Sequence, residues 1–197
     1  MENFAHSETC KNLMRAFAGE SQARNRYTFA AAAAQKQKQQ LLAQTFTFTA
    51  DQERAHAEVF WGLLKECSGD SIEIAGGYPV QTSEDLLVQL KEAVHNETEE
   101  ADDVYPAFAK TAEKEGFARV AEVFKAIAKV EQIHAARFQR FEDLLRAGKL
   151  HHSDAQSGWI CLNCGHLHYG TDAPKACPVC SHDQGYFIRA DLTPFKG

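Results

Sequence analysis

Two Glu-x-x-His pairs have the residue types and the spacing to bind metal ions. The first, Glu53 and His56, lies in the stretch DQERAHAEVF (51–60), and the second is Glu131 and His134. In a helix, residues three apart lie on one face on adjacent turns, so a carboxylate and an imidazole reach the same point. Both pairs interrupt apolar stripes, where an unpaired charge is unfavourable to bury.

Two further glutamates complete a repeated pattern. Glu20 and Glu97 also interrupt apolar stripes, and each precedes a Glu-x-x-His pair by a similar interval, from 20 to 53 and from 97 to 131. Four carboxylates and two imidazoles that converge in a helical bundle can hold two divalent metals. This ligand set favours iron or manganese over copper or zinc. The alternative is a set of buried ion pairs, but no Lys or Arg lies on these stripes to supply the cations.

Two other candidates lie near Glu97. Glu92 and His95 form a third Glu-x-x-His pair. At about 100° per residue they point away from the stripe of Glu97, so we expect them on a solvated face. Glu100 lies one turn beyond Glu97 on nearly the same side and is a candidate for an additional metal ligand.

Four of the six cysteines form two C-x-x-C pairs, Cys161 with Cys164 and Cys177 with Cys180. This spacing is typical of one tetrahedral metal site, and on spacing alone both iron and zinc remain open. The set of four is complete without the nearby histidines, which we expect at the surface: His166, His168 and His182. The isolated Cys10 and Cys67 are expected to be packing residues.

The elements that must position these residues are mainly helical. Residues 8–147 combine helix-forming residues with apolar positions at the helical period, and they are broken at 67–81 and at Gly116. We therefore predict a mainly α protein with a four-helix bundle over 1–147. A small, polar linker is expected at 148–158, followed by a metal-bound module of short β-strands over 159–197.

Composition narrows the class of protein. The chain has 197 residues, a net charge of −6 and no long basic run, which argues against nucleic-acid binding. No apolar run has membrane-spanning length, and the N-terminus has no apolar core of a secretion signal. We expect a cytoplasmic protein that binds neither nucleic acid nor membranes.

The segment between the first two helices contains no turn-forming residue. Every residue from 29 to 44 is an acceptable helix former. A helix running straight through would place Glu20 and Glu53 about 50 Å apart, at 1.5 Å per residue. Either the chain turns at 36–40 without a breaker, or helices are exchanged between two subunits. We hypothesise the exchange, that is, a domain-swapped dimer.

Taken together, these motifs resemble rubrerythrin, a ferritin-like di-iron bundle followed by a rubredoxin-like iron module. The resemblance covers nearly the whole chain. It is carried by AFAGESQARNRY, ADQERAH, NETEEADDVYPAFA, EGFARVAEVFKAIAKVEQIHAARF and the two C-x-x-C pairs. It favours iron at the four cysteines, with zinc as a possible substitute.

The resemblance also implies residue roles. Glu20, Glu53, Glu97, Glu131 and His134 would ligate the di-iron pair, with Glu53 and Glu131 bridging. His56 and Glu100 would exchange as ligands of one iron. Tyr27 and Tyr105 match tyrosines close to the family's site, although both also fit as core aromatic residues that have found a hydrogen-bond partner.

The implied activity is that of a peroxidase protecting against oxidative stress. Hydrogen peroxide would be reduced to water, with electrons passing through the four-cysteine iron from rubredoxin or an NAD(P)H-dependent reductase. In the family this transfer crosses between subunits, which implies a homodimer. One alternative is a ferroxidase that handles iron and carries a structural metal ribbon. The cysteine module argues against it, because oxidation of Fe(II) needs no electron inlet. Another alternative is an oxidative-stress sensor, but no partner-binding segment is visible.

Overall fold

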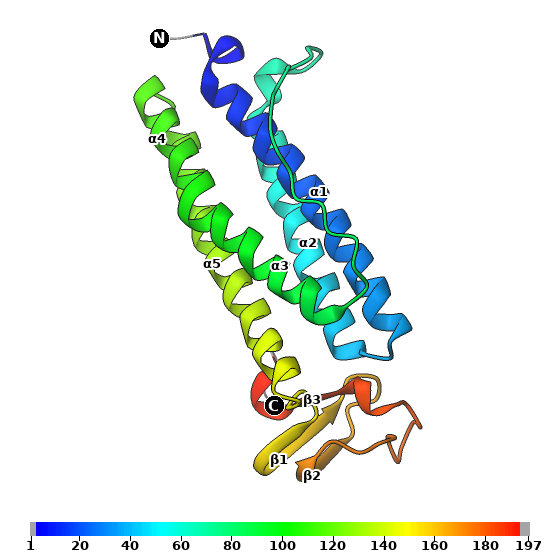
Figure 1. Cartoon of the computed structure of the whole chain (residues 1–197). Helices are drawn as coiled ribbons and strands as arrows, with labels where there is room; N and C mark the ends of the chain where they lie inside the picture. The colour runs from blue at the N-terminus through cyan, green and yellow to red at the C-terminus, as the bar shows by residue number, and fades with distance from the viewer. Residues whose placement is uncertain (1–2, 194–197) are drawn as a thin grey trace.

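The computed structural model describes residues 3–193. Its main elements are five α-helices and three β-strands: α1 (Glu8–Lys36), α2 (Gln40–Leu63), α3 (Leu86–Glu99), α4 (Tyr105–Glu115), α5 (Ala118–Arg146), β1 (His152–Cys161), β2 (Leu167–Asp172) and β3 (Phe187–Arg189). The helices form a long bundle, and the strands form a small module at one end of it (Figure 1). The predicted mainly α fold with a small C-terminal strand module is confirmed.

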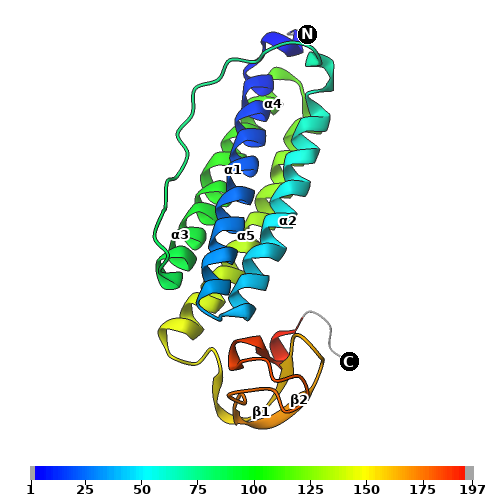
Figure 2. The ribbon, with the colours of Figure 1, turned by 90° about the vertical axis from the view of Figure 1, so that its right-hand side faces the viewer.

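Four helical rods make up the bundle. A π-helical turn at Glu100–Val104 joins α3 to α4 without a break, so the two form one rod. The α1 and α2 rods pack against each other, and α5 packs against α3 and α4 (Figure 2). Gly116, with φ of 87°, ends α4 in the left-handed conformation that favours glycine.

The chain turns between α1 and α2, contrary to the hypothesised helix exchange. Lys38 adopts a left-handed φ of 57°. The backbone N–H of Gln39 donates to the carbonyl of Ala34 at 2.9 Å, which closes the end of α1. A non-glycine residue in this conformation costs about 1–2 kcal/mol, which the extensive packing of α1 on α2 offsets. Glu20 and Glu53 are therefore brought to one level within a single chain.

A long extended segment, residues 68–85, connects the end of the 3₁₀ turn at Lys65–Cys67 to α3; we call it the strap. It runs along the outside of the bundle (Figure 2). The Tyr78 hydroxyl donates to the carbonyl of Arg15 at 3.0 Å, and Arg15 Nε donates to the carbonyl of Ala75 at 2.9 Å. These two bonds hold the strap against α1.

The strands form one antiparallel sheet in the order β2-β1-β3. Trp159 and Phe187 are fully buried in its small core. β1 begins at His152, which pairs with Asp172, so strand structure occupies much of the stretch predicted as a linker. Within the predicted linker of 148–158, the part of β1 that precedes Trp159 pairs with β2 alone.

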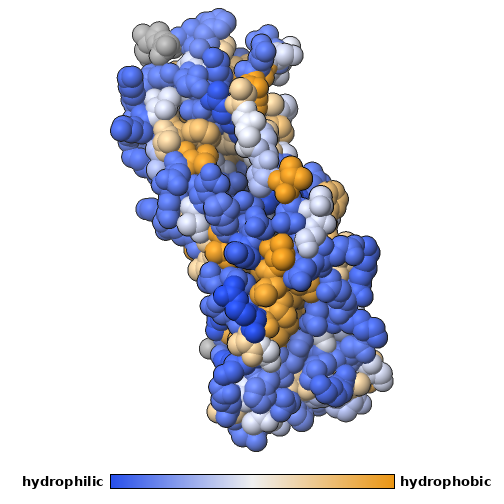
Figure 3. Space-filling model, in the orientation of Figure 1, coloured by the Kyte–Doolittle hydropathy of each residue, from blue (hydrophilic) through white to orange (hydrophobic). Residues whose placement is uncertain are grey.

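Two apolar clusters fill the bundle. Tyr27, Phe46 and Phe138 belong to the cluster near the α1–α2 turn, and Phe60 and Phe124 belong to the other. Glu53 lies between Phe46 and Phe60 along α2, so the polar stripe residues fall between the two clusters. The face of the molecule seen in Figure 3 is mostly hydrophilic, with separate apolar patches along its length, the largest of them in its lower half. Among residues 3–193, no helix is both long enough and apolar enough to cross a membrane.

Candidate metal centres

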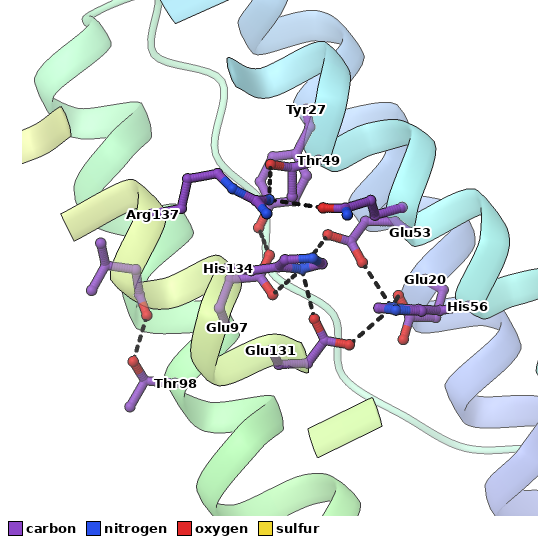
Figure 4. Close-up of polar contacts among 12 residues, drawn as sticks. Glu20, Tyr27, Thr49, Glu53, His56, Glu97, Thr98, Glu131, His134 and Arg137 are labelled. Carbon is purple, nitrogen blue, oxygen red and sulfur yellow. Dashed lines mark hydrogen bonds and ion pairs between the residues drawn. The ribbon is translucent and has the colours of Figure 1, made fainter. Parts of the chain in front are cut away.

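Six predicted ligands from four helices converge in the middle of the bundle (Figure 4). Glu20, Glu53, His56 and Glu131 bring ligand atoms within 4.8 Å of one another, and so do Glu53, Glu97, Glu131 and His134. Glu53 and Glu131 belong to both groups. This is the arrangement expected for two metal ions that share two carboxylates.

The ligand atoms converge on common points and lie in close ion-pair contact. His56 Nδ1 lies 3.0 Å from Glu131 Oε1 and 3.3 Å from Glu53 Oε2. His134 Nδ1 lies 2.8 Å from Glu131 Oε2 and 3.1 Å from Glu53 Oε1. Yet these atoms are buried, and none of them has a hydrogen-bond partner of acceptable geometry. Converging buried atoms with unused lone pairs fit a pair of bound cations.

The electrostatics of the cluster agree with this fit. Burial raises the pKa of Glu20 to about 8 and also raises the pKa of Glu97. Burial lowers the pKa of His134, but the carboxylates, led by Glu131, outweigh it and raise that pKa to about 11. So many buried carboxylates need positive charge, which protons supply in the absence of metal and divalent ions supply when bound.

Two tyrosines support the cluster from opposite sides. The Tyr27 hydroxyl donates to Glu97 Oε1, and the Tyr105 hydroxyl donates to Glu20 Oε1. Both rings are buried in the apolar clusters. These tyrosines are therefore core aromatic residues whose hydroxyls also orient candidate ligands.

The four cysteines of the module lie together at the end of two matching loops. Their Sγ atoms lie within 4.8 Å of one another. Gly165 N–H donates to the carbonyl of Cys161 at 2.8 Å, and Ser181 N–H donates to that of Cys177 at 2.9 Å. Gly165 and Ser181 both have left-handed φ, of 76° and 61°. Each C-x-x-C pair thus chelates from a tight turn, as a tetrahedral Fe or Zn site requires.

Thiolate chemistry at this site is assisted by backbone donors. The pKa of Cys180 is lowered to about 6, first by the backbone N–H of His182. Cys164 is exposed and Cys180 partly exposed, whereas Cys161 and Cys177 are buried. His182 is positioned beside this loop, with its Nδ1 3.1 Å from the carbonyl of Cys180, and not as a fifth ligand.

Comparison with known protein families decides what this combination represents. Residues 11–142 match the rubrerythrin family model, and residues 159–188 match the model of the rubrerythrin rubredoxin-like domain. The chain belongs to the rubrerythrin family. It carries the residues of a ferritin-like di-iron site and of a four-cysteine rubredoxin-like site, as the sequence predicted.

Known rubrerythrins match along nearly the whole chain. Rubrerythrin-1 of Clostridium acetobutylicum is 43% identical over 95% of this chain and 96% of its own. Rubrerythrin of Nitratidesulfovibrio vulgaris is 38% identical over 95% of this chain and 96% of its own. Among solved structures, fully reduced, all-ferrous nigerythrin has a TM-score of 0.62 at 29% identity, covering 92% of this chain and 86% of that one.

Glu100 lies beside the rubrerythrin cluster without belonging to either ligand group. It begins the π-helical turn and is half-buried. Its pKa is raised by burial and by nearby carboxylates, first those of Glu97 and Glu20. His95 is exposed and Glu92 half-buried, and neither joins the cluster.

Sequence reasoning missed Arg137, one turn beyond His134 on α5. Its guanidinium donates to Thr49 Oγ1 at 2.9 Å (Figure 4) and to Gln52 Oε1, also at 2.9 Å. It also lies 4.9 Å from the centre of the Phe48 ring. Arg137 lies at the edge of the apolar stripe and places its positive charge beside the carboxylates of the cluster. Its spacing of three from His134 was the signal that could have found it.

A cavity of about 270 Å³ adjoins the cluster. Glu100 and Tyr105 line it, as do strap residues 76–79. Asn96 and Gln22 also line it, and their side-chain nitrogens are buried without a hydrogen-bond partner. The cavity therefore offers unused donors and a carboxylate next to the metal-binding residues.

Proposed function

We propose that this chain reduces hydrogen peroxide to water at a di-iron site in the bundle, with electrons supplied through iron held by the four cysteines. The observation that carries the proposal is the coexistence of both centres in one chain. A two-metal carboxylate cluster alone would also suit Fe(II) oxidation, but a redox-capable four-thiolate centre suits a reaction that must be fed with electrons.

The reaction consumes one peroxide, two electrons and two protons and releases two water molecules. When bound, the iron pair would supply the two electrons, and iron held by the four cysteines would supply one-electron redox chemistry. Glu53 and Glu131 would bridge the pair, with Glu20, Glu97 and His134 as further ligands. His56 and Glu100 would alternate as ligands of one iron, a role that suits Glu100 at the edge of the cluster.

The cavity beneath the strap is the proposed route for peroxide. Peroxide is small and both donates and accepts hydrogen bonds. The free donors of Asn96 and Gln22 would hold an oxygen atom, and Glu100 would accept a hydrogen bond at the inner end. Tyr27 and Tyr105 would keep Glu97 and Glu20 oriented while the charge of the site changes.

The electron donor is proposed to be rubredoxin or an NAD(P)H-dependent reductase. The exposed Cys164 gives such a partner an approach to the four-cysteine site.

We further propose a homodimer in which electrons pass from the module of one subunit to the bundle of the other. Exposed apolar side chains on the bundle, such as Phe29, Trp61 and Ile133, offer surface for such an interface. The free thiols and thiolates suit a reducing compartment, and we propose the cytoplasm.

Stopped-flow reoxidation tests the activity. The anaerobically reduced protein is mixed separately with hydrogen peroxide and with dioxygen, and the visible absorption of both iron centres is followed. Rapid reoxidation by peroxide and slow reoxidation by dioxygen would support the peroxidase. The reverse preference, or a cysteine site without a visible band, would favour a ferroxidase carrying a structural zinc ribbon.

A further inference from the structure

A further redox-capable group lies outside both metal centres. Cys10 is in the first turn of α1, and Cys67 ends the 3₁₀ turn that follows α2. Although the two are 57 positions apart, their Sγ atoms lie 3.4 Å apart. Cys10 is fully buried and Cys67 is 5% exposed. This burial fits the predicted packing role, but packing alone does not require the two sulfur atoms to touch. Their contact would allow a bond to form between them.

The backbone at both cysteines is already fixed. Cys10 N–H donates to Oγ of Ser7, the N-cap of α1, at 3.1 Å. Cys67 N–H donates to the carbonyl of Leu64 at 2.9 Å, and the carbonyl of Cys67 accepts from Asp70 N–H at 3.0 Å. Disulfide sulfurs lie about 2.05 Å apart. The two sulfurs, now 3.4 Å apart, must therefore approach by about 1.4 Å to form a bond.

The two thiols differ in their access to solvent. A cavity of about 600 Å³ is lined by Cys67, together with Met14, Trp61 and Ile72, but not by Cys10. Burial, with a contribution from Cys67, raises the pKa of Cys10 to about 12, so Cys10 stays protonated. A small oxidant in this cavity therefore meets Cys67 first.

We propose that Cys10 and Cys67 form a redox-active pair that peroxide oxidises to an intrachain disulfide. The Cys67 sulfur attacks one peroxide oxygen, the O–O bond breaks, and Cys67 sulfenic acid and one water are formed. The Cys10 sulfur then attacks the Cys67 sulfur, the S–O bond breaks, and the hydroxyl leaves with the Cys10 proton as a second water. Two thiols are oxidised to one disulfide, and one peroxide is reduced to two waters.

The disulfide would tie the start of α1 to the end of α2. Closing so long a loop restricts the unfolded chain and should raise thermal stability when peroxide is in excess. The proposal does not depend on peroxidase activity at the metal cluster, because peroxide oxidises thiols whether or not that cluster turns over.

The test uses the full-length, metal-loaded protein. It is reduced, freed of reductant, treated with graded hydrogen peroxide, alkylated with N-ethylmaleimide in denaturant and digested. We expect a peptide pair joined between Cys10 and Cys67. We also expect a melting temperature raised by about 5 °C or more, reversed by dithiothreitol. Links among the four module cysteines give different peptides and do not interfere.

Two variants test the order of the steps. In Cys10→Ser, dimedone should trap a sulfenic acid on Cys67; in Cys67→Ser, Cys10 should remain alkylatable. The proposal is overturned if wild-type Cys10 and Cys67 are both still alkylated after peroxide in large excess. Preferential dimedone labelling of Cys10 would overturn the assigned order. The wild-type result does not depend on how either variant folds.

Discussion

Glu53 and Glu131 are the residues that join the two halves of the cluster, because each belongs to both ligand groups. Each comes from a Glu-x-x-His pair on its own helix, and together they bring α2 and α5 to one site. The flanking glutamates are each held by a tyrosine hydroxyl from another helix.

Removing one Glu-x-x-His pair should remove the bundle's iron. The double change Glu131→Gln and His134→Ala deletes a shared carboxylate and an imidazole. We expect bundle iron to fall from about two ions per chain to fewer than one, with the cysteine iron retained. Elemental analysis and the visible band of the cysteine site measure this.

The matched control is Glu92→Gln with His95→Ala, which has the same spacing but lies outside the cluster. It should leave both iron counts unchanged. Equal loss of iron in the two double variants would contradict the assignment of the ligands.

Asn96 tests the peroxide route. Asn96→Leu keeps the side-chain size but removes the unpartnered donor at the cavity. We expect KM for peroxide to rise about tenfold, with kcat nearly unchanged, because a binding contact is lost and the metal ligands stay in place. Steady-state kinetics at varied peroxide measure this. Asn25→Leu, at an exposed position of α1, is the control; an unchanged KM in Asn96→Leu would reject this route.

At the scale of elements, the π-helical turn is the feature that adapts a regular rod to the site. It inserts at Glu100–Val104, between Glu97 and Tyr105. The extra residue in this turn changes which side chains face the core, so that Glu97 on α3 and Tyr105 on α4 both reach the cluster. π-turns within α-helices are frequent at functional sites for this reason.

The elements also explain what the sequence could predict. The helical period of the apolar residues was enough to predict a core position for four glutamates: Glu20, Glu53, Glu97 and Glu131. Charged residues that interrupt an apolar stripe are easily recognised. The turn at 36–40 was one of two alternatives that the sequence left open, since none of its residues favours a turn and packing of α1 on α2 decides it. Arg137 lies beside a stripe and not on it.

Lys38 provides a stability test of this turn. Glycine adopts the left-handed φ of 57° without strain, whereas alanine does not. Lys38→Gly should therefore be more stable than Lys38→Ala by about 1 kcal/mol, measured by chemical denaturation of the bundle. Both variants lose the exposed Lys38–Asp183 ion pair, so the comparison isolates the backbone. A more stable Lys38→Ala would show that the strain is not there.

For the whole molecule, the position of the cysteine module bears on how electrons travel. The module packs against the α1–α2 turn: a Cβ added at Gly185 would lie 1.8 Å from the carbonyl oxygen of Lys38, and Lys38 Nζ lies 3.2 Å from Asp183 Oδ2. The module thus sits at one end of the bundle (Figure 1), whereas the metal-ligand cluster lies between the two apolar clusters. We propose, for this reason, that the module of one subunit serves the bundle of another.

Complementation between two inactive variants distinguishes the routes. One variant keeps the bundle cluster but carries Cys161→Ser and Cys164→Ser; the other keeps the module but carries Glu131→Gln and His134→Ala. Neither alone should reduce peroxide with electrons from the donor protein. If electrons cross between subunits, refolding a one-to-one mixture should restore about a quarter of wild-type activity, because half the dimers are mixed and each has one complete route. A route within one chain gives no recovery, because no chain in the mixture carries both centres.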